Sequence, residues 1–160
     1  MKENKYETMG KYLIVTLNLL ITFGVLALFD IIIRTSAKTI NTKVMVNCSL
    51  FFIGTASLLF ILISLRKILK AVIKEGPFNM CNVRNLKNIA VSCFVITVCY
   101  LVNFFYNNQL SSFALINIDA KGIHTDTEFL IFFFAGFFIL ILAQIYKQAV
   151  EVKEENDFTI

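Results

Sequence analysis

The chain has 160 residues, of which 58% are hydrophobic and 16% are charged, and its formal net charge is +4. Soluble domains are closer to about 45–50% apolar and about 25% charged. A core of this size cannot hide so much apolar surface, which excludes an ordinary soluble enzyme. The same apolar excess excludes a disordered chain. The composition therefore predicts a membrane protein, with the lipid bilayer as its first partner.

Four apolar runs, almost free of charge, account for half of the chain. A helix needs about 20 residues to cross about 30 Å of hydrocarbon, whereas a barrel strand alternates polar and apolar side chains over about ten residues. Because the runs are continuous, they predict helices. We therefore predict an all-α integral membrane protein of one domain, residues 1–160, a four-helix transmembrane bundle with spans at residues 12–33, 44–65, 89–106 and 129–146 and a tail at residues 147–160.

Basic residues outside these runs fall mostly on one side of the membrane. The amino-terminal tail has three, the segment between spans two and three has six, and the carboxy-terminal tail has two, whereas the other two loops have four together. Because lysine and arginine resist translocation, the richer side is predicted to be cytoplasmic, with both termini inside. This asymmetry accounts for most of the positive charge, so we infer no direct contact with nucleic acid.

The segment after span two keeps a helical period, with apolar side chains on one side and basic ones largely on the other. It is predicted to continue span two as an amphipathic helix at the inner surface. Gly76 and Pro77 should end that helix, and Asn79 or Asn82 should cap the next. Small residues at 54–57, 135–136 and 143 should permit close contact between spans.

Two stretches carry a resemblance to a known family. The residues Glu75-Gly76-Pro77-Phe78-Asn79, followed by Val83-Arg84-Asn85-Leu86-Lys87-Asn88-Ile89, resemble the Pro-Phe cytoplasmic turn of an uncharacterised family of bacterial four-span membrane proteins. The ending, residues 149–160, is similar to that family's closing Glu-Asn-Asp-Leu-Thr-Val signature. The resemblance implies a location in the bacterial inner (cytoplasmic) membrane. Genes of the family often neighbour a small helix-turn-helix regulator of the Cro-repressor type, which implies a regulatory role.

Motifs for catalysis are missing from the sequence: there is no G-x-S-x-G, no phosphate loop and no H-E-x-x-H. We therefore predict no enzymatic activity and no cofactor. In an extended loop, His124, Asp126 and Glu128 would face one way and could hold a divalent ion. We favour the alternative, a solvated loop in which Asp126 or Thr127 caps the fourth helix, so no metal is predicted.

Three polar residues lie three positions inside the outer ends of their spans, at a depth of about 4.5 Å. They are Asp30, Asn47 and Asn103. At one depth they are expected to face inward together, either as hydrogen bonds between helices or as an outward-open site for an ion or small ligand. We favour the hydrogen bonds. Asp30 also precedes Arg34 by one turn, which favours an interfacial ion pair.

The cytoplasmic face is the candidate interaction site. Its basic loop has a net charge of +5 and its tail −2, so opposite charges should bring them together weakly. The favoured function is a non-enzymatic regulatory or interaction protein that presents both to a cytoplasmic partner, for which a helix-turn-helix regulator is one candidate. Alternatives are a small transporter and an immunity protein against membrane-active peptides, and a homo-oligomer is compatible with each. The predicted partner-binding residues are Arg66, Lys67, Lys70, Lys74, Pro77, Phe78, Arg84, Glu154, Glu155, Asn156, Asp157 and Phe158.

Overall fold

The computed structural model describes residues 2–36, 41–107, 117–119, 122–124 and 127–157, with side chains for residues 8–33, 41–74, 76–107 and 127–156. Most of the described residues are helical. The elements are α1 (Lys2–Ser36), α2 (Thr42–Glu75), α3 (Met80–Tyr106), β1 (Asn117–Asp119), β2 (Gly122–His124) and α4 (Glu128–Asp157). β1 and β2 form a short antiparallel hairpin that the sequence did not predict, with Ile118 opposite Ile123.

All four helices are long and apolar enough to cross a membrane. Each predicted span lies inside one helix, so the all-α, four-span fold is confirmed. The amphipathic segment after Leu65 is also confirmed as helix, because α2 continues without a break to Glu75. Helix α4 runs on past Tyr146 to Asp157.

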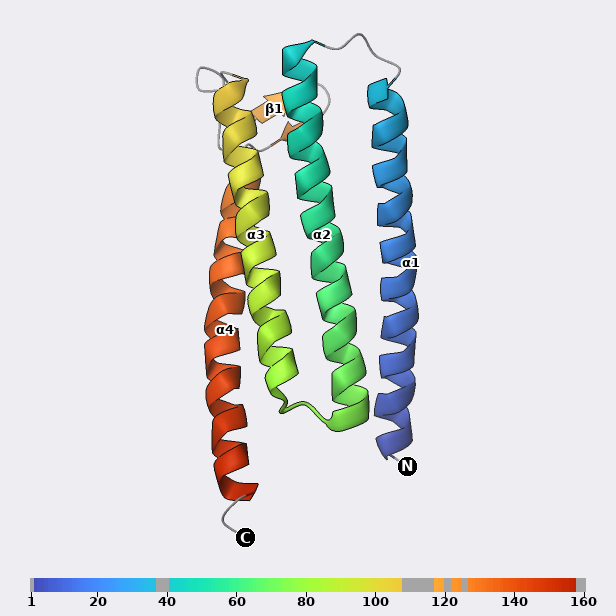
Figure 1. The fold of residues 1–160 in the computed structure, drawn as a ribbon, viewed down its shortest axis with the longest axis vertical. Helices are drawn as coiled ribbons and strands as arrows, with labels where there is room; N and C mark the ends of the chain where they lie inside the picture. The colour runs from blue at the N-terminus through green and yellow to red at the C-terminus, as the bar shows by residue number, and fades with distance from the viewer. Residues whose placement is uncertain (1, 37–40, 108–116, 120–121, 125–126, 158–160) are drawn as a thin grey trace.

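The helices lie side by side in chain order, and the two termini lie at the same end (Figure 1). Among the described residues, each helix contacts its neighbour in the chain, and α1 contacts neither α3 nor α4. The bundle is therefore open, with α1 and α4 at its edges. We call the end that holds the termini and the α2–α3 turn the termini end, and the opposite end the loop end.

The turn at residues 76–79 is built from residues that cannot continue a helix. Gly76 has φ +87°, a left-handed conformation that suits glycine, and Pro77 follows it. Asn79 then caps α3, because its side-chain Oδ1 accepts a hydrogen bond of 2.8 Å from the Cys81 backbone N–H. Of the two predicted caps, Asn79 is the one used.

Glycines set how closely the helices approach. A Cβ on Gly136 of α4 would lie 3.2 Å from Cys93 Cβ and 3.3 Å from the Ala90 carbonyl oxygen of α3. On α1, Gly24 lies against Leu59 and Gly10 against Ile73 of α2. Close contact at small residues is typical of membrane helices, because no hydrophobic driving force acts between helices in lipid and van der Waals packing must hold them together.

Candidate functional site

The α2–α3 turn is fastened to α4 at the termini end. The hydroxyl of Tyr146 donates a hydrogen bond to the Pro77 carbonyl oxygen. The same oxygen also accepts a hydrogen bond of 2.9 Å from Nδ2 of Asn82. The rings of Tyr146 and Phe78 are stacked, with their centroids 5.7 Å apart and an angle of 22° between their planes. One carbonyl thus receives donors from both α3 and α4, which fixes the turn between the two helices.

Beyond Tyr146, α4 continues as an ordered extension over residues 147–157. Val150 is 1% exposed, so it anchors the extension, and Lys147 pairs with Glu151 at 3.2 Å on the same helix. The other side of the extension forms a shallow groove that includes Phe78, Val152, Lys153 and Asn156.

The predicted partner-binding residues fall on three parts of this end. Pro77 and Phe78 belong to the fastened turn. Glu154, Glu155 and Asn156 are exposed on the extension, Asp157 ends it, and Phe158 lies outside the described residues. Aromatic and backbone contacts join this turn to α4, through the ring stack of Phe78 on Tyr146 and the hydrogen bond from the Tyr146 hydroxyl to the Pro77 carbonyl. Of the predicted basic residues, Lys67, Lys70, Lys74 and Arg84 are exposed on α2 and α3.

Arg66 differs from the other bases in where it lies. It is seven residues from both Leu59 and Ile73, so the three lie on one face of α2. Leu59 contacts Gly24 and Ile73 contacts Gly10, and therefore Arg66 lies opposite the midpoint of these two glycines on α1. Its Nε is buried and has no hydrogen-bond partner in the described part of the chain. Arg66 belongs to the α1–α2 seam more than to the exposed surface.

At the loop end, asparagines of α2 and α3 form a hydrogen-bonded cluster. Nδ2 of Asn107 donates to Oδ1 of Asn103 at 2.8 Å and to Oδ1 of Asn47 at 3.3 Å, and Nδ2 of Asn47 lies 3.5 Å from Oδ1 of Asn107. The structure thus brings together two of the three polar residues predicted to meet. Asp30 is exposed on α1, which contacts α2 but not α3 in the described part of the chain.

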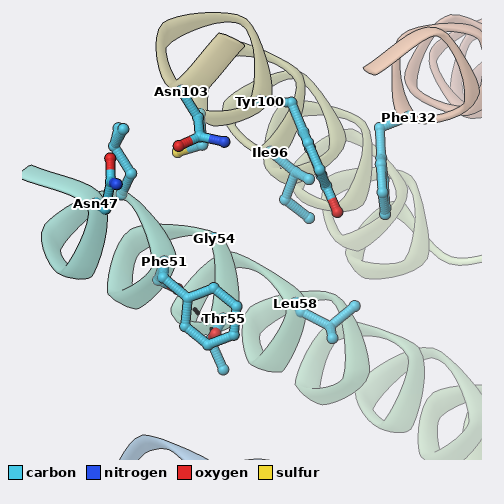
Figure 2. Close-up of a pocket in the computed structure, with 11 residues that line it drawn as sticks. Asn47, Phe51, Gly54, Thr55, Leu58, Ile96, Tyr100, Asn103 and Phe132 are labelled. Atoms are coloured by element: carbon cyan, nitrogen blue, oxygen red, sulfur yellow. Dashed lines mark hydrogen bonds between the residues drawn. The ribbon is translucent and has the colours of Figure 1, made fainter. Parts of the chain in front are cut away.

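Directly below the asparagines, a pocket of about 440 Å³ opens between α2 and α3. Figure 2 shows Asn47 and Asn103 pointing toward one another from the two helices, with Tyr100 and Phe132 forming a wall beside them. The rings of Tyr100 of α3 and Phe132 of α4 are stacked, with their centroids 5.9 Å apart and an angle of 18° between their planes. The lining is otherwise apolar or weakly polar: Leu50, Phe51, Gly54, Thr55, Leu58, Ile96 and Cys99.

The predicted metal alternative falls largely outside the described side chains. His124 is described by its backbone alone, in β2, and Asp126 lies outside the described residues. Glu128 is the first residue of α4. Within the described part of the chain, no group of three or more His, Cys, Asp or Glu could hold a metal ion.

Comparison with known proteins places the chain without naming an activity. No curated protein and no solved structure matches it. Residues 31–160 match the family described as "Protein of unknown function (DUF2975)". The match includes α2, α3, α4 and only the end of α1, one of the two edge helices. Since it covers most of the chain, the protein belongs to this DUF2975 family of unknown function.

Proposed function

We propose that the protein is a non-enzymatic membrane regulatory or interaction protein whose termini end binds a cytoplasmic protein partner. The observation that carries this proposal is the ordered extension of α4 outside the predicted span. Tyr146 bonds to the turn and Val150 is buried, so the extension presents a fixed surface. A surface that is already ordered loses less conformational entropy on binding than a frayed tail would.

Exposed apolar side chains support a protein partner. Phe78 is 45% exposed and Val152 is 56% exposed, and both border the shallow groove of the extension. Both lie outside the predicted spans, where water rather than lipid would surround them. An apolar patch rimmed by polar residues is typical of an interaction site. The groove therefore favours a partner that inserts an apolar side chain beside Phe78.

The charged residues of the termini end also support its role as the partner-binding surface. Exposed Lys67, Lys70, Lys74 and Arg84 lie on α2 and α3, and exposed Glu154 and Glu155 lie on α4. Such a mixture gives specificity and faster association more than affinity, and the lysines would also attract anionic lipid of the inner leaflet. In this proposal the termini end is cytoplasmic, the membrane is the bacterial inner membrane, and the partner is a helix-turn-helix regulator, as the family resemblance implies.

Affinity purification of the tagged full-length protein from its own membranes tests the proposal. Val152→Asn changes an exposed groove residue, and Lys43→Asn changes an exposed residue at the loop end as the matched control. Quantitative mass spectrometry should show one cytoplasmic protein that is several-fold depleted with Val152→Asn and retained with Lys43→Asn. Identical co-purified proteins for both variants and the unchanged protein would argue against a partner in the groove.

A second candidate function, transport or immunity against membrane-active peptides, is favoured by the α2–α3 pocket. These functions depend on the spans and not on the extension. Gly54→Leu would fill part of the pocket, because a Cβ at Gly54 meets nothing within 4 Å. Loss of transport or of peptide resistance with Gly54→Leu, and its retention with Val152→Asn, would favour this candidate over the first.

A further inference from the structure

The α2–α3 pocket has the dimensions of a small-molecule site. Its lining on α2 runs from Asn47 to Leu58, which is about 16 Å along the helix. Its volume of about 440 Å³ falls within the range of about 300–1,000 Å³ that ligand pockets occupy. The pocket is long for its volume and is therefore suited to a slender molecule.

Its polar end has hydrogen-bonding capacity to spare. A carboxamide has two N–H donors, yet Asn103 only accepts a bond, from Asn107, and donates none to the described part of the chain. The single donor contact of Asn47 is 3.5 Å long, at the limit of a hydrogen bond. Donors left over at membrane depth carry a free-energy cost that a bound acceptor would remove.

Tyr100 adds a second polar group lower in the pocket. Its ring is held by the stack on Phe132, and its hydroxyl makes no hydrogen bond to any described residue. A phenol can both donate and accept. A ligand oxygen near Tyr100 would satisfy it, while Phe51, Leu58 and Ile96 offer only apolar contact.

Among the described residues that line the pocket, none is charged. A carboxylate, phosphate or ammonium group placed here would be desolvated without a counter-charge, which is costly inside a membrane. An uncharged headgroup with hydroxyl or ester oxygens avoids this cost of desolvating a charge. The polar end toward the loops and the apolar end toward mid-membrane also match the direction in which a lipid chain lies.

We propose that the pocket binds one single-chain, uncharged amphiphile of the monoacylglycerol type, with its hydroxyl-bearing headgroup at Asn47 and Asn103, an ester oxygen near Tyr100, and its hydrocarbon chain along Phe51 and Leu58. The site lies at the loop end, so this assignment does not depend on which protein binds the termini end.

The chain contains no tryptophan, so one introduced tryptophan reports only on its own position. Phe51→Trp places it in the pocket lining, and Phe52→Trp places it at the same depth on a neighbouring face that does not line the pocket. Both full-length variants would be reconstituted in phosphatidylcholine nanodiscs with a brominated monoacylglycerol, whose bromines quench tryptophan fluorescence. Quenching of Phe51→Trp should saturate at a low fraction of the amphiphile, and quenching of Phe52→Trp should rise only in proportion to it.

Second substitutions and competitors sharpen this test. Gly54→Leu should abolish the saturable quenching of Phe51→Trp and leave the proportional quenching of Phe52→Trp unchanged, while helical circular dichroism checks that the protein is folded. Asn103→Leu should weaken binding about 5- to 30-fold, the effect of one or two lost hydrogen bonds in a membrane. Unlabelled monooleoylglycerol should displace the quencher.

Three results would overturn the assignment. The first is equal, unsaturable quenching of Phe51→Trp and Phe52→Trp. The second is displacement by oleate or lysophosphatidylglycerol as effective as that by monooleoylglycerol, since a charged headgroup finds no counter-charge among the described lining residues. The third is displacement by a membrane-active helical peptide while monooleoylglycerol has no effect, which would assign the pocket to a peptide.

Discussion

The packing between α3 and α4 should be destabilised when Gly136 gains a single methyl group. In Gly136→Ala, the new Cβ would lie 3.1 Å from Phe94 Cε1 and 3.2 Å from Cys93 Cβ. Carbons are most favourable at about 3.5–4.0 Å, so both contacts are too close. Cys93 Cβ is fixed to the α3 backbone, and the Phe94 ring is wedged among the Phe133 and Phe137 rings. The clash is therefore relieved only if α4 moves away from α3.

The magnitude follows from two opposing terms. Overpacking costs about 1–3 kcal/mol, and alanine gains about 0.5–1 kcal/mol over glycine in a helix. We expect Gly136→Ala to lower the free energy of unfolding by about 0.5–2 kcal/mol. Gly54→Ala is the matched control, because a Cβ there meets nothing within 4 Å. It should be neutral or stabilising by up to about 1 kcal/mol.

The assay is unfolding of both variants in the same detergent, followed by helical circular dichroism during heating and during titration with a denaturing detergent. Gly136→Ala should unfold before the unchanged protein, and Gly54→Ala with it or after it. If the two variants unfold together, or in the reverse order, Gly136 does not lie in a tight α3–α4 seam and the helix packing described here is wrong.

Three further predictions concern other contacts. Tyr146→Phe should lower the free energy of unfolding by about 0.5–1.5 kcal/mol, because it removes the donor to Pro77 and keeps the ring stack; no change in the denaturation midpoint would mean that this bond contributes nothing. Asn107→Leu should cost about 0.6–1.7 kcal/mol, since Asn107 joins the other two asparagines, and an unchanged midpoint would count against the cluster. With the other three cysteines replaced by serine, exposed Cys81 should react with an impermeant maleimide only after cells are permeabilised, whereas Lys43→Cys in that background should react in intact cells; the opposite pattern would reverse the predicted orientation.

The spans were predictable because apolar run length is a local property of the sequence. The turn was predictable for the same reason, since Gly76, Pro77 and Asn79 act through their own backbone preferences. Helix order was not, because composition does not say which helices touch. The open arrangement separates α1 from α3, and depth alone therefore could not show that α1, with Asp30, does not contact the helix that carries Asn103.

Two other residues show the same limit at the level of helix faces. Asn107 follows the last apolar residue of α3, and an estimate of depth that stops at the span misses it, although it makes the shortest bond of the cluster. Arg66 was counted as one more base of a loop, but its position seven residues from two seam residues turns it toward α1. The heptad spacing of Leu59, Arg66 and Ile73 was the signal that could have shown this.

Photo-crosslinking in living cells can capture a cytoplasmic protein that binds the extension of α4. A photo-activated amino acid would replace Val152 in the groove, and in a parallel strain Lys43 at the loop end. We expect a discrete crosslinked band from position 152 that contains a cytoplasmic protein, and no such band from position 43. Position 152 yielding only lipid adducts, or a protein exposed on the outer side of the membrane, would contradict this expectation.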